Sequence, residues 1–103
     1  MLVLEASTRR SFHEAVHDVA EAINAAGGWV VTHQFFSNRL ASIAFEIPAS
    51  ALGAFAASLA DLGVTLHQPV PDRAAVAGEI AAQLSITFVQ DGPDIRREVP
   101  AFG

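Results

Sequence analysis

The chain has no cysteine, no lysine and no tyrosine among its 103 residues. Without cysteine it forms no disulfide, thiolate metal site or thiol nucleophile, so the sequence does not encode its redox compartment. Without lysine it has no Schiff-base chemistry and no ammonium nucleophile. A chain of this length still forms one domain with a modest hydrophobic core, and we expect no cofactor.

Charge is also scarce, at 17% of the residues, with six basic residues against eleven acidic ones and a net charge of −5. All six basic residues are arginine and form no basic stripe, which argues against a nucleic-acid partner. The longest apolar runs are far shorter than the ~20 residues that span a bilayer. We therefore expect a cytoplasmic, acidic globular domain that binds neither membrane nor nucleic acid.

Hydrophobic periodicity predicts five strands and two helices. The strands are expected over residues 1–7, 29–36, 40–47, 64–68 and 84–90, and the helices over 12–26 and 52–62. Ser11 and Glu14 fit a capping box at the start of the first helix, and Ser50 is expected to cap the second. Gly27 and Gly63 are expected to end the two helices.

This order of elements predicts an α+β fold of the ferredoxin-like βαββαβ type, in which an antiparallel sheet carries both helices on one face. Residues 1–68 would form this core, with the first and third strands at the centre of the sheet. Residues 69–83 would be a connecting loop, 84–90 an extra strand and 91–103 a tail, all within one domain.

The hairpin between the second and third strands is predicted to turn through Ser37, Asn38 and Arg39, because this length places apolar residues on one face. That face would carry Trp29, Val31, His33 and Phe35. Asn38 or Arg39 would adopt the left-handed conformation. Trp29 and the seven phenylalanines are spaced as core residues.

Residues 1–68 resemble small ACT-type regulatory domains in the order and lengths of their elements: a short strand, a capped helix ending in Gly27-Gly28, a long hairpin and a shorter helix ending in Gly63. The resemblance implies a regulatory domain whose effector binds near the first strand and helix. ACT-type domains commonly carry a glycine and an acidic residue there, whereas this chain has Ala6-Ser7-Thr8-Arg9-Arg10. Dimeric α+β-barrel proteins share the same element order and are a close rival.

The turn between the first strand and the first helix is the first candidate site. Thr8, Arg9, Arg10 and Ser11 offer hydroxyls, guanidinium groups and the free N–H groups of a helix N-terminus, which together suit a carboxylate or phosphate. The alternative is that the arginines are solvated and Ser11 only caps the helix.

The sheet face without helices is the second candidate site. Glu5, Glu46 and His67 are expected on this face, where they could form an acid–base pair or a carboxylate–histidine site. The alternatives are an ordinary half-solvated face and a subunit interface. The interface is suggested by the apolar residues expected there, namely Val3, Val30, Phe36, Leu40 and Ala44.

The remaining histidines are interpreted structurally. His13 and His17 have the four-residue spacing of metal ligands on a helix, but the sequence fixes no third ligand, so we expect solvated residues and no metal site. His33 is interpreted as a histidine in the core or at its edge, although a ligand or base remains an alternative.

We therefore expect a non-catalytic small-ligand-binding or regulatory module that acts as a homodimer and senses a small anion. The alternative is a small dimeric α+β-barrel-type enzyme with its site on the open sheet face. The fifth strand is expected to extend or cross onto the partner chain, and a five-stranded monomer is the rival.

Overall fold

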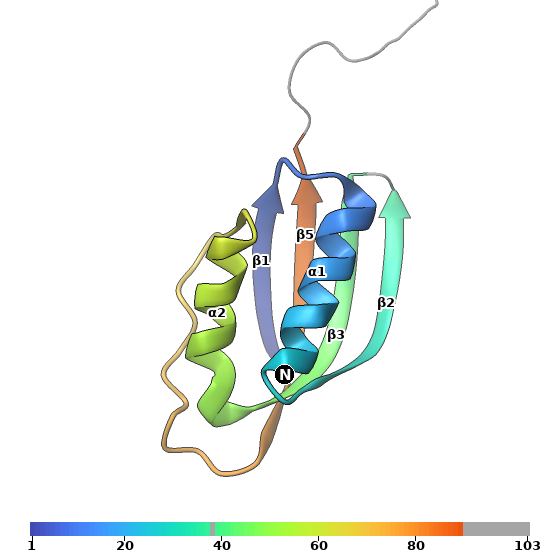
Figure 1. The fold of residues 1–103 in the computed structure, drawn as a ribbon. Helices are drawn as coiled ribbons and strands as arrows, with labels where there is room; N and C mark the ends of the chain where they lie inside the picture. Colours follow the sequence, from blue (N-terminus) through green and yellow to red (C-terminus); the bar gives the residue numbers. More distant parts are fainter. Residues whose placement is uncertain (38, 90–103) are drawn as a thin grey trace, which may run out of the picture.

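The computed structural model describes residues 1–37 and 39–89 (Figure 1). The expected positions of Asn38, Gln90 and the tail at 91–103 lie outside the described residues. The elements in chain order are β1 (Leu2–Thr8), α1 (Phe12–Ala25), β2 (Trp29–Ser37), β3 (Leu40–Pro48), the 3-10 helix η1 (Ala49–Ala51), α2 (Leu52–Asp61), β4 (Val64–Leu66) and β5 (Glu79–Phe88).

The strands form one mixed sheet in the order β2-β3-β5-β1-β4. Both helices cover the same face of this sheet (Figure 1), which confirms the α+β class and the expected two-layer arrangement. This arrangement is compatible with a ferredoxin-like fold. However, the expectation of an antiparallel sheet with the first and third strands together at its centre is wrong. β5 lies between these strands, parallel to β1 and antiparallel to β3.

β5 differs most from its prediction. It begins at Glu79 rather than Leu84, so the expected loop at 69–83 contains the first part of a strand. Leu84, Ile86 and Phe88 are buried on the helix-covered side, as their alternation predicted. Because β5 bonds to β1 on one edge and β3 on the other, the expectation that it crosses onto a partner chain is wrong.

The two helices agree with their predicted positions. The Ser11 hydroxyl accepts a hydrogen bond from the Glu14 N–H at 3.4 Å, as a helix cap does. Gly27 and Gly63 have φ angles of +89° and +79° after the helices, where glycine is favoured. The predicted Ser50 cap is wrong, because η1 precedes α2 and no side chain caps that helix.

The β2–β3 hairpin contains two bulges that the face-matching prediction lacks. Ser37 pairs with Leu40, while His33 and Phe35 share the helix-covered face with their partners Ile43 and Ala41, as expected. A bulge between Val30 and Thr32 exchanges the faces on which the first side chains of the strand lie. There Trp29 pairs with Glu46 and Val30 with Phe45, which is the opposite of the prediction.

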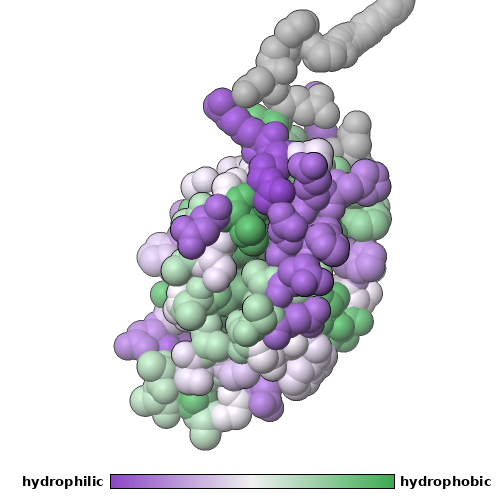
Figure 2. All heavy atoms as spheres, in the orientation of Figure 1, coloured by the Kyte–Doolittle hydropathy of each residue, from purple (hydrophilic) through white to green (hydrophobic). Residues whose placement is uncertain are grey.

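The core lies between the helices and the sheet, and Phe45, Phe55, Leu4, Ile23 and Ile43 are among its largest fully buried side chains. On the helix side, hydrophilic residues gather over α1, whereas the region over α2 is pale to green (Figure 2). In the described part of the chain, no helix is long and apolar enough to cross a membrane.

β2 lies outside this core. Trp29, Phe35 and Phe36 are 45%, 51% and 60% exposed, so the expectation that these aromatics belong to the core is wrong. β2 is the last strand on its side of the sheet, and although Phe12 of α1 contacts Phe35, no residue of β2 is fully buried. An alternating apolar pattern identifies a strand, but it does not show whether another layer covers that strand.

Candidate functional site

The turn between β1 and α1 borders an open pocket of about 520 Å³. The pocket includes three of the residues predicted to hold an anion, Thr8, Arg9 and Arg10. Its lining is drawn from β1, the turn, the start of β4 and the end of β5, and comprises Ser7, Thr8, Arg9, Arg10, Gly63, Thr65 and Val89.

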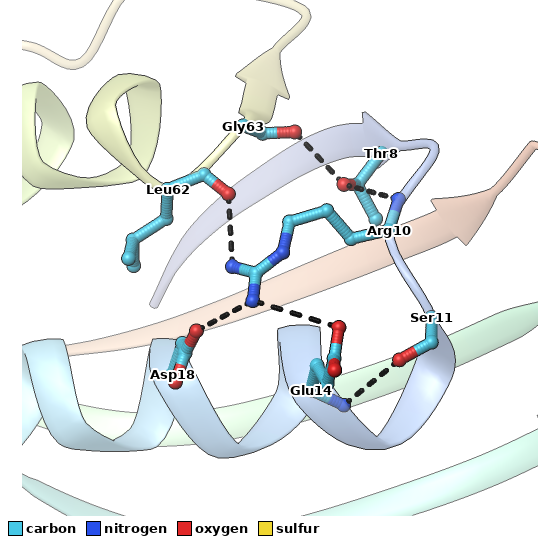
Figure 3. Close-up of polar contacts among 7 residues, drawn as sticks. All are labelled: Thr8, Arg10, Ser11, Glu14, Asp18, Leu62 and Gly63. Carbon is cyan, nitrogen blue, oxygen red and sulfur yellow. Dashed lines mark hydrogen bonds and ion pairs between the residues drawn. The ribbon is translucent and has the colours of Figure 1, made fainter.

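Thr8 is only 3% exposed, although its side chain is polar. Its hydroxyl donates a hydrogen bond to the carbonyl oxygen of Gly63 at 2.8 Å and accepts one from the backbone N–H of Arg10 at 3.2 Å (Figure 3). Both hydrogen-bonding functions of the hydroxyl are therefore used within the fold. Thr8 joins the β1–α1 turn to the segment that leads from α2 into β4.

Arg10 reaches across the same junction. One terminal nitrogen, Nη1, donates to the carbonyl oxygen of Leu62 at 3.0 Å, just after α2 ends. The other, Nη2, donates to Oδ2 of Asp18 at 2.7 Å and lies 3.9 Å from Oε1 of Glu14 (Figure 3). Cations are favoured at helix C-termini, where backbone carbonyls lack partners. Arg10 therefore links the turn, α1 and the end of α2.

This arrangement changes what the predicted anion site can do. The charge of Arg10 is balanced by Asp18 and Glu14, and the Ser11 hydroxyl already accepts a bond from Glu14. An anion at the turn would therefore compete with carboxylates for the Arg10 guanidinium. Arg9 lines the pocket beside them.

Asp18 and Leu62 were not predicted from the sequence as partners of Arg10. Glu14 had a detectable signal, because it follows Arg10 by only four residues and lies in the first turn of α1. Asp18 lies one further turn along α1. The Leu62 partner is a backbone carbonyl, which every residue has, so the type of residue at position 62 does not predict this hydrogen bond.

The alternative site on the open sheet face is only partly assembled. The backbone N–H of His67 donates to the carbonyl oxygen of Glu5 at 2.8 Å, so these residues are neighbours on adjacent segments. Glu5 aligns across β5 with Ser42, whereas Glu46 lies four residues further along β3. That offset separates Glu46 from Glu5 by roughly 16 Å. The predicted trio of Glu5, Glu46 and His67 therefore does not converge.

The other histidines lie on exposed surfaces. His13 and His17 are exposed on α1, and His33 is exposed on β2 with its ring centroid 5.0 Å from that of Phe35. His33 thus stands at the edge of the core, on the predicted face. Within residues 1–37 and 39–89, no group of three or more histidine or acidic side chains is placed to hold a metal ion.

The β2 edge, which we define as residues 29–37, is the most exposed apolar part of the sheet. Trp29, Val31, Phe35 and Phe36 are each at least 45% exposed. The face without helices adds Val3, which is 55% exposed. Scattered exposed apolar residues are normal on a monomer, but such a concentration on one strand is typical of an interaction surface.

Comparison with known proteins gives no match to this chain among protein-family models, curated proteins or solved structures.

Proposed function

We propose that this protein is a non-catalytic binding module that acts as a homodimer. The observation that carries the proposal is the apolar surface that the sheet leaves exposed. It combines an apolar edge strand, β2, with an open face that carries Val3. A second copy of the same chain would cover this surface, and two-fold homodimers are the commonest soluble assemblies.

The same geometry gives less support to a catalytic role. The carboxylate of Glu46 lies too far along the sheet to act with Glu5 and His67 on one substrate bond. The resemblance to ACT-type regulatory domains also favours a binding role over catalysis. An enzyme of the α+β-barrel type is the alternative, and it would need a second copy to close a cavity over Glu5 and His67.

The turn at Thr8, Arg9, Arg10 and Ser11 contributes less to this proposal than the sheet does. Thr8 and Arg10 hold the fold together, and Ser11 caps α1. We therefore propose a role in assembly for the sheet and assign no ligand to the turn.

Sedimentation equilibrium on the full chain tests the proposal. One chain has a mass of 10.8 kDa. At micromolar concentrations we expect a particle of twice that mass, which dissociates on dilution, because burial of the exposed apolar side chains favours association. A single-chain mass over the whole concentration range would contradict the proposal.

A further inference from the structure

We propose that two copies of this chain pair through β2, antiparallel and about a two-fold axis, so that their sheets join into one. This inference rests on the proposed homodimer and names the surface that forms it. The alternative surface is the open sheet face, where two copies would pack face to face.

The backbone of β2 is suited to such pairing. β2 has nine residues and stands at the end of the sheet, so its outer edge has no neighbouring strand in the described part of the chain. The N–H and C=O groups along such an edge can accept another strand. The opposite edge strand, β4, has only three residues. Pairing through β2 alone therefore stops at two copies and does not build a fibre.

The side chains of β2 favour a second copy as the occupant. The strand reads WVVTHQFFS and contains no Asp, Glu, Lys or Arg. Edge strands of monomers are commonly protected by such charges or by bulges. β2 lacks the charges, and its two bulges leave the stretch from Thr32 to Phe35 regular. The chain carries a net charge of −5, which makes two copies repel each other. An uncharged strand allows them to approach without placing like charges in contact.

The charges at the two ends of β2 favour an antiparallel arrangement. Arg39 follows the strand, and Glu46 pairs across β3 with its first residue, Trp29. Antiparallel pairing brings the Arg39 end of each copy to the Glu46 end of the other. Parallel pairing would instead bring like ends together.

The symmetry limits the register. A two-fold axis perpendicular to the sheet keeps all four helices on one face and pairs residues whose side chains share a face. One residue must then lie on the axis and face its own copy. The stretch between the two bulges runs from Thr32 to Phe35, so its middle residues, His33 and Gln34, are the candidates for the axis.

The area of the edge is near the lower limit for a stable dimer. A large aromatic side chain buries about 150–250 Å² when it is fully covered. Trp29, Phe35 and Phe36, each about half exposed, therefore offer roughly 300 Å² per copy. Val31, the polar side chains and the backbone edge add to this on both copies, towards the ~1,200 Å² of a small specific interface. We therefore expect a weak dimer, which is present at micromolar concentrations and dissociates on further dilution.

A matched pair of substitutions separates the two surfaces. Val31 on the β2 edge and Val3 on the open face are 59% and 55% exposed, so lysine is accommodated at either site in the monomer. We expect Val31→Lys to raise the dimer dissociation constant by roughly 100-fold or more, because a charged side chain on an edge strand opposes pairing with another strand. Val3→Lys should leave that constant unchanged. Sedimentation equilibrium gives both values, and circular dichroism checks the fold.

Cysteine crosslinking tests the register independently, because the natural chain has no cysteine. With oxidised glutathione as oxidant, either His33→Cys or Gln34→Cys should form a covalent dimer, since a residue on the axis lies opposite its own copy. Ser37→Cys is the control, because its two copies would lie about 20 Å or more apart.

The outcomes distinguish this inference from the homodimer itself. A wild-type chain that is monomeric overturns both. A wild-type dimer that persists in Val31→Lys and dissociates in Val3→Lys overturns the edge pairing and leaves the homodimer standing. If both lysine variants dissociate or either fails to fold, crosslinking decides. A covalent dimer at residue 33 or 34, but not at 37, supports the edge pairing, and any other pattern overturns it.

Discussion

Thr8 and Arg10 show how polar residues near a pocket can serve the fold rather than a ligand. Both were predicted from the sequence as part of an anion site, and both line the pocket at the β1–α1 turn. The sequence did not predict that their side chains would form hydrogen bonds with Gly63, Leu62 and Asp18. These partners come from segments distant in the sequence or from backbone carbonyls, and residue type and spacing give no information about either.

Thr8 carries the clearest residue-level prediction. Replacing Thr8 by valine keeps the shape of the side chain but leaves the Gly63 carbonyl and the Arg10 N–H without their buried partner. We expect Thr8→Val to lower the free energy of unfolding by about 1–3 kcal/mol. Thr8→Ser keeps the hydroxyl and serves as the control. Urea unfolding measures both, and equal stability of the two variants would contradict the role assigned to the hydroxyl.

Two glycines provide a second matched comparison. A Cβ at Gly28 would lie 2.3 Å from the carbonyl oxygen of Glu46, where the chain enters β2 close to β3. Gly53, on α2, has no heavy atom within 4 Å of the same position. We expect Gly28→Ala to destabilise the fold by about 1–3 kcal/mol, because the backbone must move.

The same change at Gly53 should be neutral or stabilising by up to ~1 kcal/mol, since alanine favours a helix. Thermal unfolding of the two variants measures the difference. A loss of stability at Gly53 as large as at Gly28 would show that close approach to Glu46 is not the cause.

At the scale of elements, the sequence predicts more about each strand than about its neighbours. The capped helix α1, the stripe of buried residues on α2 and the buried face of β5 follow from local periodicity and are confirmed. The order of the strands in the sheet, by contrast, depends on contacts between distant parts of the chain. In a sheet with one open face, central and edge strands show the same alternation of apolar and polar residues. The hydrophobic pattern therefore does not distinguish β5, a central strand, from β2, an edge strand.

The position of β5 gives a prediction about truncation. Ending the chain after Asp72 removes the strand between β1 and β3, and with it Leu84 and Ile86 from the core. We expect this variant to lose cooperative unfolding, because the two remaining strand pairs share no hydrogen bonds. Circular dichroism during thermal unfolding tests this.

Deletion of residues 91–103 is the control, since it leaves every described strand in place. A cooperative transition in the shorter variant would contradict the central role of β5.

At the scale of the whole molecule, hydrophilic and apolar side chains are exposed in different places. Hydrophilic side chains gather over α1 on the covered side (Figure 2), while β2 carries exposed aromatic residues and no charge. The sequence predicted an apolar surface in excess of what a monomer exposes, but it assigned Phe35 to the core. The composition of an exposed edge strand does not differ from that of a buried strand. The exposure of β2 is therefore seen only from the arrangement of strands and helices in the structure.

The central place of β5 also bears on how the chain folds as it leaves the ribosome. The strand that joins the two parts of the sheet is the last described element to be synthesised, and its partner β1 is among the first. Proteins whose contacts join distant parts of the chain fold slowly, and many domains fold only once they are fully synthesised. Until residue 88 has emerged, β1 and β3 both lack their shared neighbour β5, and such unpaired strand edges make a nascent chain prone to aggregation.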